Sequence, residues 1–185
     1  MKKYIGIDNS LTSPGIVILS EDGSIDKMWY YSHKLKWDGK LGDNLEGIPY
    51  PAYTSEEERI YKLSTITTAI VENEANKGHD VLVSIEGYSF GSTGMRLFQI
   101  AENTGLLKNM LWLKKIDFNV VPPTTVKKLA TGKGNAQKQV VYDCFCKETG
   151  LNLHDTFGFK SNKAVNPISD IADAYWMAKW RMINQ

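Results

Sequence analysis

Two apolar segments that each end in an acidic residue constrain the fold of this chain more than any other feature. Residues 4–8 and 80–86 are strand-like runs that close on Asp8 and Glu86. Between them, residues 55–77 show the apolar spacing of a helix. A helix that connects two strands of one sheet makes them parallel neighbours, so both acids should lie at the edge where open α/β sheets bind ligands. Taken alone, Asp8 fits a turn-forming role equally well.

The other segments predict an α/β fold built on a mixed five-stranded sheet flanked by helices. Residues 15–19 and 25–32 extend residues 4–8 into a three-stranded antiparallel meander. Residues 80–86 and 118–121 are then the parallel additions. With 185 residues and 42% hydrophobic content, the whole chain is expected to form a single domain.

Residues 34–54 form an irregular insertion in this order, because glycines and prolines interrupt a run rich in aromatic residues. Loops of about 20 residues inside a compact domain are usually functional or mobile. Two interpretations remain open. The lysines and rings of the insertion bind nucleic acid, or the insertion is a surface elaboration that packs on its own rings.

The chain from Ser169 onwards predicts a final helix, with Ser169 as its N-cap and a single apolar stripe. Asp170 and Asp173 are neighbours on the surface of that helix. This pair fits either the helix dipole or a cation site. Because Asp8 and Glu86 point to the same place, four carboxylates can converge, and they would repel one another unless cations bound them. Such oxygen ligands favour Mg²⁺ or Mn²⁺, and two ions about 3.5–4 Å apart would clamp a phosphodiester.

The formal net charge of +1 hides a basic half of the chain. Residues 96–147 contain nine basic and three acidic residues. A surplus of this kind suits a phosphate-backbone surface, although solvated helix faces also carry lysines. The candidate DNA contacts in this half are Arg96, Lys127, Lys128 and Lys133. Residues 132–138 combine glycines with a helix start and so broadly resemble an anion cradle, but Lys138 lies too far from the second glycine for a Walker motif.

Several other classes of site are disfavoured. Cys144 and Cys146 are two residues apart in a predicted helix and point to different faces, which argues against a disulfide or a metal pair. The sequence offers neither a His/Cys zinc set nor a Ser-His-Asp arrangement. It starts with Met-Lys-Lys and runs directly into a strand, without a signal region or an apolar run of membrane length, so we expect a cytoplasmic protein that does not enter membranes.

A helix predicted for residues 95–114 is apolar on more than one side. One sheet face does not need so many apolar side chains. The helix is therefore either fully buried or covered by a partner, and we favour a homodimer contact.

Four motifs in order resemble one known family. They are Gly6-Ile7-Asp8 with Pro14-Gly15-Ile16-Val17, then Ser84-Ile85-Glu86 with its aromatic loop and long helix, then Gly132-x-Gly134-x-Ala136-x-Lys138, and finally Asp170-Ile171-Ala172-Asp173-Ala174. Each motif is common alone, but the ordered set is more specific. Over most of its length the chain resembles RuvC-type Holliday-junction resolvases, which belong to the ribonuclease H-like superfamily.

This resemblance implies a ribonuclease H-like sheet, a homodimer joined through the helix after Glu86, and paired cuts across four-way DNA junctions. It implies metal ligands at Asp8, Glu86, Asp170 and Asp173, and a phosphate contact at Lys138. We expect Asp173 to be a direct ligand, and Asp170 to be a ligand or a base that positions water.

Three departures from the family pattern bear on substrate choice. Asn9-Ser10 replaces the usual small turn, and the insertion at 34–54 is longer than usual. The family's junction-inserting aromatic falls on Ser89, so Tyr88 or Phe90 would take that role. Arg59 matches a recurrent arginine of the family. A phage-type member of the family would act on branched DNA more broadly.

Three functional hypotheses follow. The leading one is a Mg²⁺-dependent, structure-selective DNA endonuclease that acts on four-way and other branched junctions. The second is a non-catalytic protein that binds branched DNA on the same scaffold. The third is an actin-like phosphotransferase, because a Gly-x-Asp strand followed by Ser and Thr also opens that fold, although the chain lacks a second nucleotide-binding half.

Overall fold

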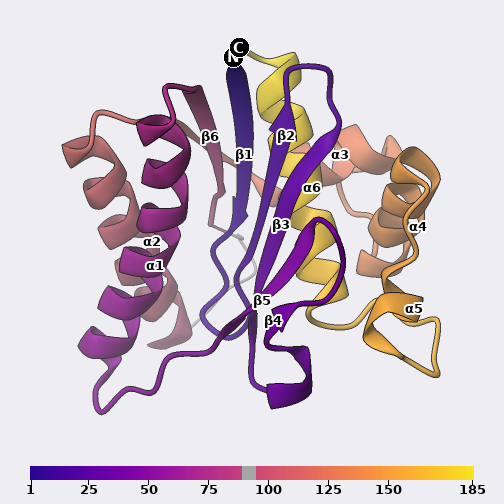
Figure 1. Cartoon of the computed structure of the whole chain (residues 1–185), viewed down its shortest axis with the longest axis horizontal. Helices are drawn as coiled ribbons and strands as arrows, with labels where there is room; N and C mark the ends of the chain where they lie inside the picture. The colour runs from indigo at the N-terminus through magenta and orange to yellow at the C-terminus, as the bar shows by residue number, and fades with distance from the viewer. Residues whose placement is uncertain (89–94) are drawn as a thin grey trace.

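The computed structural model describes residues 1–88 and 95–185 and contains one mixed seven-stranded sheet with helices on both faces (Figure 1). The strands are β1 (Lys2–Asp8), β2 (Gly15–Ser20), β3 (Ile25–Ser32), β4 (Gly39–Lys40), β5 (Leu45–Pro49), β6 (Asp80–Glu86) and β7 (Asp117–Val121). The helices are η1 (Leu35–Trp37), α1 (Glu56–Asn76), α2 (Met95–Leu113), α3 (Pro123–Thr131), α4 (Lys138–Thr149), α5 (Leu153–Phe157) and α6 (Ile168–Ile183). The predicted α/β architecture is confirmed.

The sheet has the order β4-β5-β3-β2-β1-β6-β7. Strands β1, β2 and β3 form the predicted antiparallel meander. Strand β6 lies parallel to β1, and β7 lies parallel to β6. The connection through α1 therefore brings the carboxyl ends of β1 and β6 to the same sheet edge, as the sequence predicted.

The insertion at 34–54 adds two strands to the five that the sequence predicted. It contains η1, β4 and β5; β5 lies parallel to β3, and β4 pairs with β5 as the edge strand. Sequence reasoning missed these strands because they are short and interrupted by glycine and proline, which disfavour strands. The ring of Trp37 in η1 packs edge-on against Phe157 and Phe159, so the insertion rests partly on aromatic residues from α5 and the segment after it.

Helix α6 lies directly on β1 and β2, and α3, α4 and α5 lie on the same side of the sheet (Figure 1). The prediction of one apolar stripe is wrong, because residues on every side of α6 are buried between the sheet and the neighbouring helices. The prediction that Ser169 caps this helix is also wrong. The helix begins at Ile168 after Pro167, and the Ser169 hydroxyl donates to the side-chain oxygen of Asn166 at 3.0 Å.

Helices α1 and α2 cover the opposite face (Figure 1). Ser55 caps α1, since its hydroxyl accepts from the backbone N–H of Glu58 at 3.2 Å. Helix α2 buries Leu107 and Leu111 against the sheet, yet Phe98 and Trp112 are 66% and 68% exposed. Within residues 1–88 and 95–185, no helix is long and apolar enough to cross a membrane.

Candidate active site

Four carboxylates meet at the carboxyl-end edge of the sheet. Asp8 ends β1 and Glu86 ends the parallel strand β6, with Ile7 opposite Ile85 in the register. Helix α6 contributes the side chains of Asp170 and Asp173, and all four acids line one cavity of about 500 Å³. The structure thus brings together the four acids that the sequence proposed as a group.

Two glycines allow α6 to lie close enough for this convergence. A Cβ atom on Gly6 would lie 1.9 Å from the backbone oxygen of Ala174, and one on Gly15 would lie 2.6 Å from that of Asp170. Real Cβ atoms do not approach other atoms so closely, so any side chain at these positions would push the helix away from the sheet. The glycines of the first motif therefore set the distance between the strand acids and the helix acids.

Burial disfavours the charged forms of all four acids, and repulsion between carboxylates adds to this effect at Asp8, Glu86 and Asp173. Burial is the largest cause at each, and it raises the pKa of the Asp8, Glu86 and Asp170 carboxyl groups. At Asp8 the charges of the other three acids raise the pKa further, well above its ordinary value. Burial, with repulsion from Glu86 and Asp170, raises the pKa of Asp173 to about 7 although a nearby lysine opposes the shift. Positive charge placed beside these four carboxyl groups would therefore stabilise their ionised forms.

Lys138, the first residue of α4, supplies part of that charge. Its ammonium nitrogen lies 3.2 Å from Oδ1 of Asp170 and 3.9 Å from Oδ2 of Asp173. Burial alone would lower the pKa of Lys138, but the attraction of Asp170, Asp173 and Asp8 outweighs it and raises the pKa. The lysine side chain remains half exposed at the mouth of the cavity. It can therefore meet both the acids and an incoming anion.

The donor set fits a hard divalent cation. Oδ2 of Asp170 is buried and has no hydrogen-bond partner among the described residues, which leaves a strong acceptor unused. Among those residues, no three acidic, histidine or cysteine side chains converge closely enough to share one ion as they stand. Metal binding would therefore require the carboxylates to rotate towards the ion. Asp8, Glu86, Asp170 and Asp173 are the residues that could hold it.

The other predicted contacts are distributed around this cavity. Lys127 of α3 lines it, whereas Lys128 and Lys133 are exposed beyond it. Tyr88 is 40% exposed, two residues after Glu86. Ser89 and Phe90 lie outside the described residues, and the structure describes the backbone of Arg96 at the start of α2 but not its side chain.

The turn between β1 and β2 forms a further wall that sequence reasoning did not assign to the site. Asn9, Leu11 and Thr12 line the acid cavity. Arg59 donates to the backbone oxygen of Leu11 at 2.7 Å, and Asn103 donates to that of Asn9 at 3.1 Å. Asn103 is fully buried in α2. Helix α2 carries other polar residues, such as Gln99 and Lys108, so the sequence held no signal that singled out Asn103.

Comparison with solved structures gives the same architecture. A structure of Thermus thermophilus RuvC has a TM-score of 0.58 and 17% identity, over 95% of this chain and 90% of that one. A structure of T. thermophilus RuvC in complex with a Holliday junction substrate has a TM-score of 0.63 and 16% identity, over 96% and 91%. The chain has a RuvC-like fold. This confirms the ribonuclease H-like sheet, and at such low identity the likeness shows the fold alone. No family model and no curated protein matches the sequence.

Proposed function

We propose that this protein is a divalent-metal-dependent, structure-selective DNA endonuclease that cleaves phosphodiester bonds in four-way junctions and other branched DNA. The observation that carries the proposal is the single cavity lined by Asp8, Glu86, Asp170 and Asp173, with Lys138 at its mouth. The RuvC-like fold supports it, because one of the similar structures holds a Holliday junction substrate.

The four acids would hold two Mg²⁺ ions, or Mn²⁺ in their place. Such ions activate water and stabilise the leaving oxygen of a phosphodiester. The chain's own residues then have separate tasks. Lys138 neutralises carboxylates in the free protein and would turn to the phosphate in the complex. Lys127 adds a second positive charge on the α3 wall of the cavity, and Lys128, Lys133, Arg96, Tyr88, Ser89 and Phe90 are the proposed outer DNA contacts.

We further propose that two copies of the chain pair through α2. Phe98 and Trp112 are separated by about four helical turns and therefore share one face, and both are largely exposed. Exposed apolar residues gathered on one helix face are typical of protein interfaces. A dimer would present two acid cavities to one junction and so permit paired cuts. The protein would act on such DNA in the cytoplasm.

The alternative is a non-catalytic protein that binds branched DNA. One observation favours it, since no three described acids converge on a single point and Lys138 pairs with Asp170 instead. A protein of this kind would bind junctions tightly and leave them uncut.

A cleavage assay separates the two functions. Labelled four-way junctions, three-way junctions and plain duplex are incubated with the protein in Mg²⁺, Mn²⁺ or EDTA. We expect cuts in the branched substrates only, and only with metal. Asp8→Asn and Glu86→Gln should bind without cutting, whereas Asp43→Asn, which changes an exposed acid remote from the cavity, should cut normally. Retained cleavage by Asp8→Asn would overturn the endonuclease assignment, and intact junctions despite tight binding would favour the alternative.

A further inference from the structure

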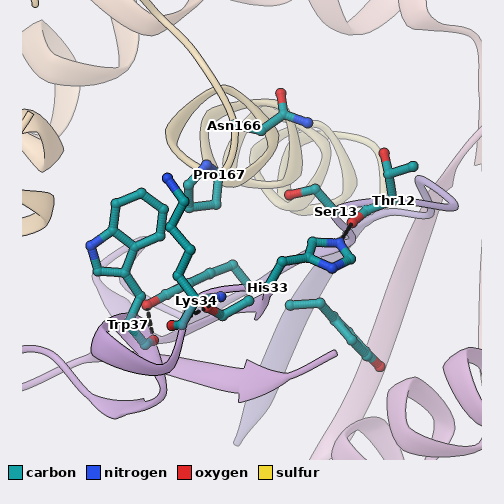
Figure 2. A pocket seen from close by; sticks show the side chains of 10 residues that line it. Thr12, Ser13, His33, Lys34, Trp37, Asn166 and Pro167 are labelled. Atoms are coloured by element: carbon teal, nitrogen blue, oxygen red, sulfur yellow. Dashed lines mark hydrogen bonds between the residues drawn. The ribbon is translucent and has the colours of Figure 1, made fainter. Parts of the chain in front are cut away.

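A second cavity lies beside the acid cavity and belongs to no part of the proposed catalytic chemistry (Figure 2). Its volume is about 210 Å³. Three segments enclose it, namely the β1–β2 turn, the end of β3 with η1, and the turn before α6. Thr12 and Asn166 line both cavities, so these two residues form the shared wall. A strand held at the acids would therefore pass next to this second opening.

An imidazole ring forms one side of the second cavity. His33 is exposed, and its Nε2 lies 2.7 Å from the backbone oxygen of Thr12. Its ring stacks on Tyr50, with centroids 4.1 Å apart and planes 23° apart. Tyr50 is itself bonded to Leu11 and Arg59. The ring is thus held in one orientation, with one face on Tyr50, while the residue is exposed and lines the cavity, as a stacking platform requires.

A cation and an indole form the opposite side. Figure 2 shows Lys34 beside the Trp37 ring, across the cavity from His33 and below Pro167. The Lys34 ammonium lies 4.3 Å from the centroid of that ring. Trp37 is buried and anchored by Phe157 and Phe159, so the contact keeps an exposed lysine at a defined place.

The surroundings are basic and favour a polyanion. None of the residues that line the cavity is acidic. The bordering segments, residues 33–40 and 156–166, carry five lysines and one acidic residue. The cavity is smaller than the roughly 300–1,000 Å³ that drug-sized ligands occupy, and so suits a single flat ring system. A ring platform, a point cation and a polar rim are together the chemistry that recognises a nucleotide within a strand.

We propose that this cavity is a nucleotide subsite, in which a base next to the scissile phosphate stacks on His33 while Lys34 neutralises a neighbouring phosphate. The subsite rests on the proposed endonuclease function. It requires the cleaved DNA strand to run from the acid cavity over Thr12 and Asn166 into the second cavity. It makes the insertion at 34–54 a determinant of which nucleotide can occupy the position beside the cut.

An abasic scan tests the proposal. In an Asp8→Asn background, affinities are measured by fluorescence anisotropy for four-way junctions in which each nucleotide near the cut is replaced in turn by an abasic analogue. One flanking position should lose affinity about 5- to 150-fold, the range expected for one base stacked on one aromatic ring. The loss should vanish in His33→Ala and persist in His33→Phe, which keeps a ring but no imidazole nitrogen. The absence of any sensitive position, or the same loss in His33→Ala, would overturn the subsite.

The role of Lys34 has a different signature. Lys34→Ala should weaken binding to intact and abasic junctions alike, and should reduce the salt dependence of binding by about one counterion. Lys2→Ala is the matched control, because Lys2 lies at the opposite end of β1 from Asp8. An unchanged salt dependence in Lys34→Ala would remove the phosphate contact from the proposal.

Three outcomes distinguish a failure of this proposal from a failure of the endonuclease function. Cleavage of junctions without an abasic effect would overturn the subsite and leave the enzyme. An abasic effect without cleavage would leave the cavity as a nucleotide subsite of a protein that binds branched DNA and would overturn the enzyme. Failure to bind branched DNA would overturn both. A further experiment is a titration with free deoxynucleoside monophosphates. If these bound tightly in a way that depends on His33, and junctions showed no abasic effect, the cavity would be a site for a free nucleotide and the strand subsite would be refuted.

Discussion

Replacing Asp173 with asparagine should make the metal-free protein more stable at pH 8 while it abolishes cleavage. Burial and repulsion by neighbouring acids raise the pKa of this carboxyl group from 3.8 to about 7. Below pH 4 the group is protonated in the folded and unfolded states alike, and it costs nothing. Between about pH 4 and pH 7 the unfolded chain releases the proton while the folded chain keeps it, so stability falls as pH rises. Above pH 7 the full penalty remains.

The size of the effect follows from the two pKa values. At about 1.36 kcal/mol for each pH unit, the rise from 3.8 to about 7 corresponds to a penalty of about 4 kcal/mol at pH 8. Asparagine is similar in shape and does not ionise, so Asp173→Asn should recover up to this amount. For chains of 150–250 residues, about 2–4 °C accompanies each kcal/mol, which gives a rise in Tm of roughly 8–16 °C.

The assay is thermal unfolding in EDTA at pH 4, 6 and 8, repeated at pH 8 with Mg²⁺. The two proteins should unfold at similar temperatures at pH 4 and separate progressively towards pH 8. Mg²⁺ should raise the Tm of the wild type and raise that of Asp173→Asn less, because a ligand that binds only the folded state stabilises it. Asp43→Asn, at an exposed position, should behave like the wild type throughout. If Asp173→Asn were less stable than the wild type at pH 8 in EDTA, the account of a repelling acid cluster would be wrong.

Three further substitutions test how the site is positioned. Gly6→Ala places a Cβ atom 1.9 Å from the backbone of α6, so it should lower the free energy of unfolding in denaturant by about 1–3 kcal/mol or more and eliminate the Mg²⁺ effect on Tm. The control is Gly105→Ala, whose Cβ meets no atom within 4 Å and which should be neutral or slightly stabilising. Arg59→Lys removes the planar guanidinium that donates to the backbone oxygen of Leu11, so amide hydrogen exchange in residues 9–13 should become faster and kcat should fall. Unchanged hydrogen exchange would show that Arg59 does not position this turn. Trp112→Ser should convert a dimer to monomers in sedimentation equilibrium, and a wild-type protein that is already monomeric would refute the α2 interface.

Some of the site could be read directly from the sequence because its signals are local. A buried strand that ends in an acid is visible at Asp8 and at Glu86, and the helix between them determines that the strands are parallel. The pair at 170 and 173 is visible through its helical spacing. What joins them is not local. The close approach of α6 to Gly6 depends on packing between residues almost the full length of the chain apart, and no periodic pattern encodes it.

Other features escaped prediction for separate physical reasons. The prediction of a single apolar stripe on α6 was wrong because a helix that is enclosed by a sheet and by other helices buries residues on every side. The short strands β4 and β5 carry glycine and proline, which usually mark loops. Lys138 and Asp170 lie on two helices that meet only in the folded chain, so their contact leaves no local signal in the sequence. The motif at residues 132–138 therefore indicated an anion site near Lys138 but not the acidic residue beside it.

The burial of α6 also determines how the acid cluster can respond to metal. Because this helix is enclosed on all sides and lies on Gly6 and Gly15 without space for a methyl group, its backbone cannot shift to bring Asp170 and Asp173 towards Asp8. Only side-chain rotations remain, and these are opposed by repulsion and assisted by a cation. Lys138 carries a single positive charge on a flexible, half-exposed side chain beside Asp170, so a divalent ion held by the acids would be able to displace it while the backbone stays in place. A Lys138 side chain released from Asp170 would then be able to bind a phosphate, so the proposed metal and substrate sites would be coupled through this one residue.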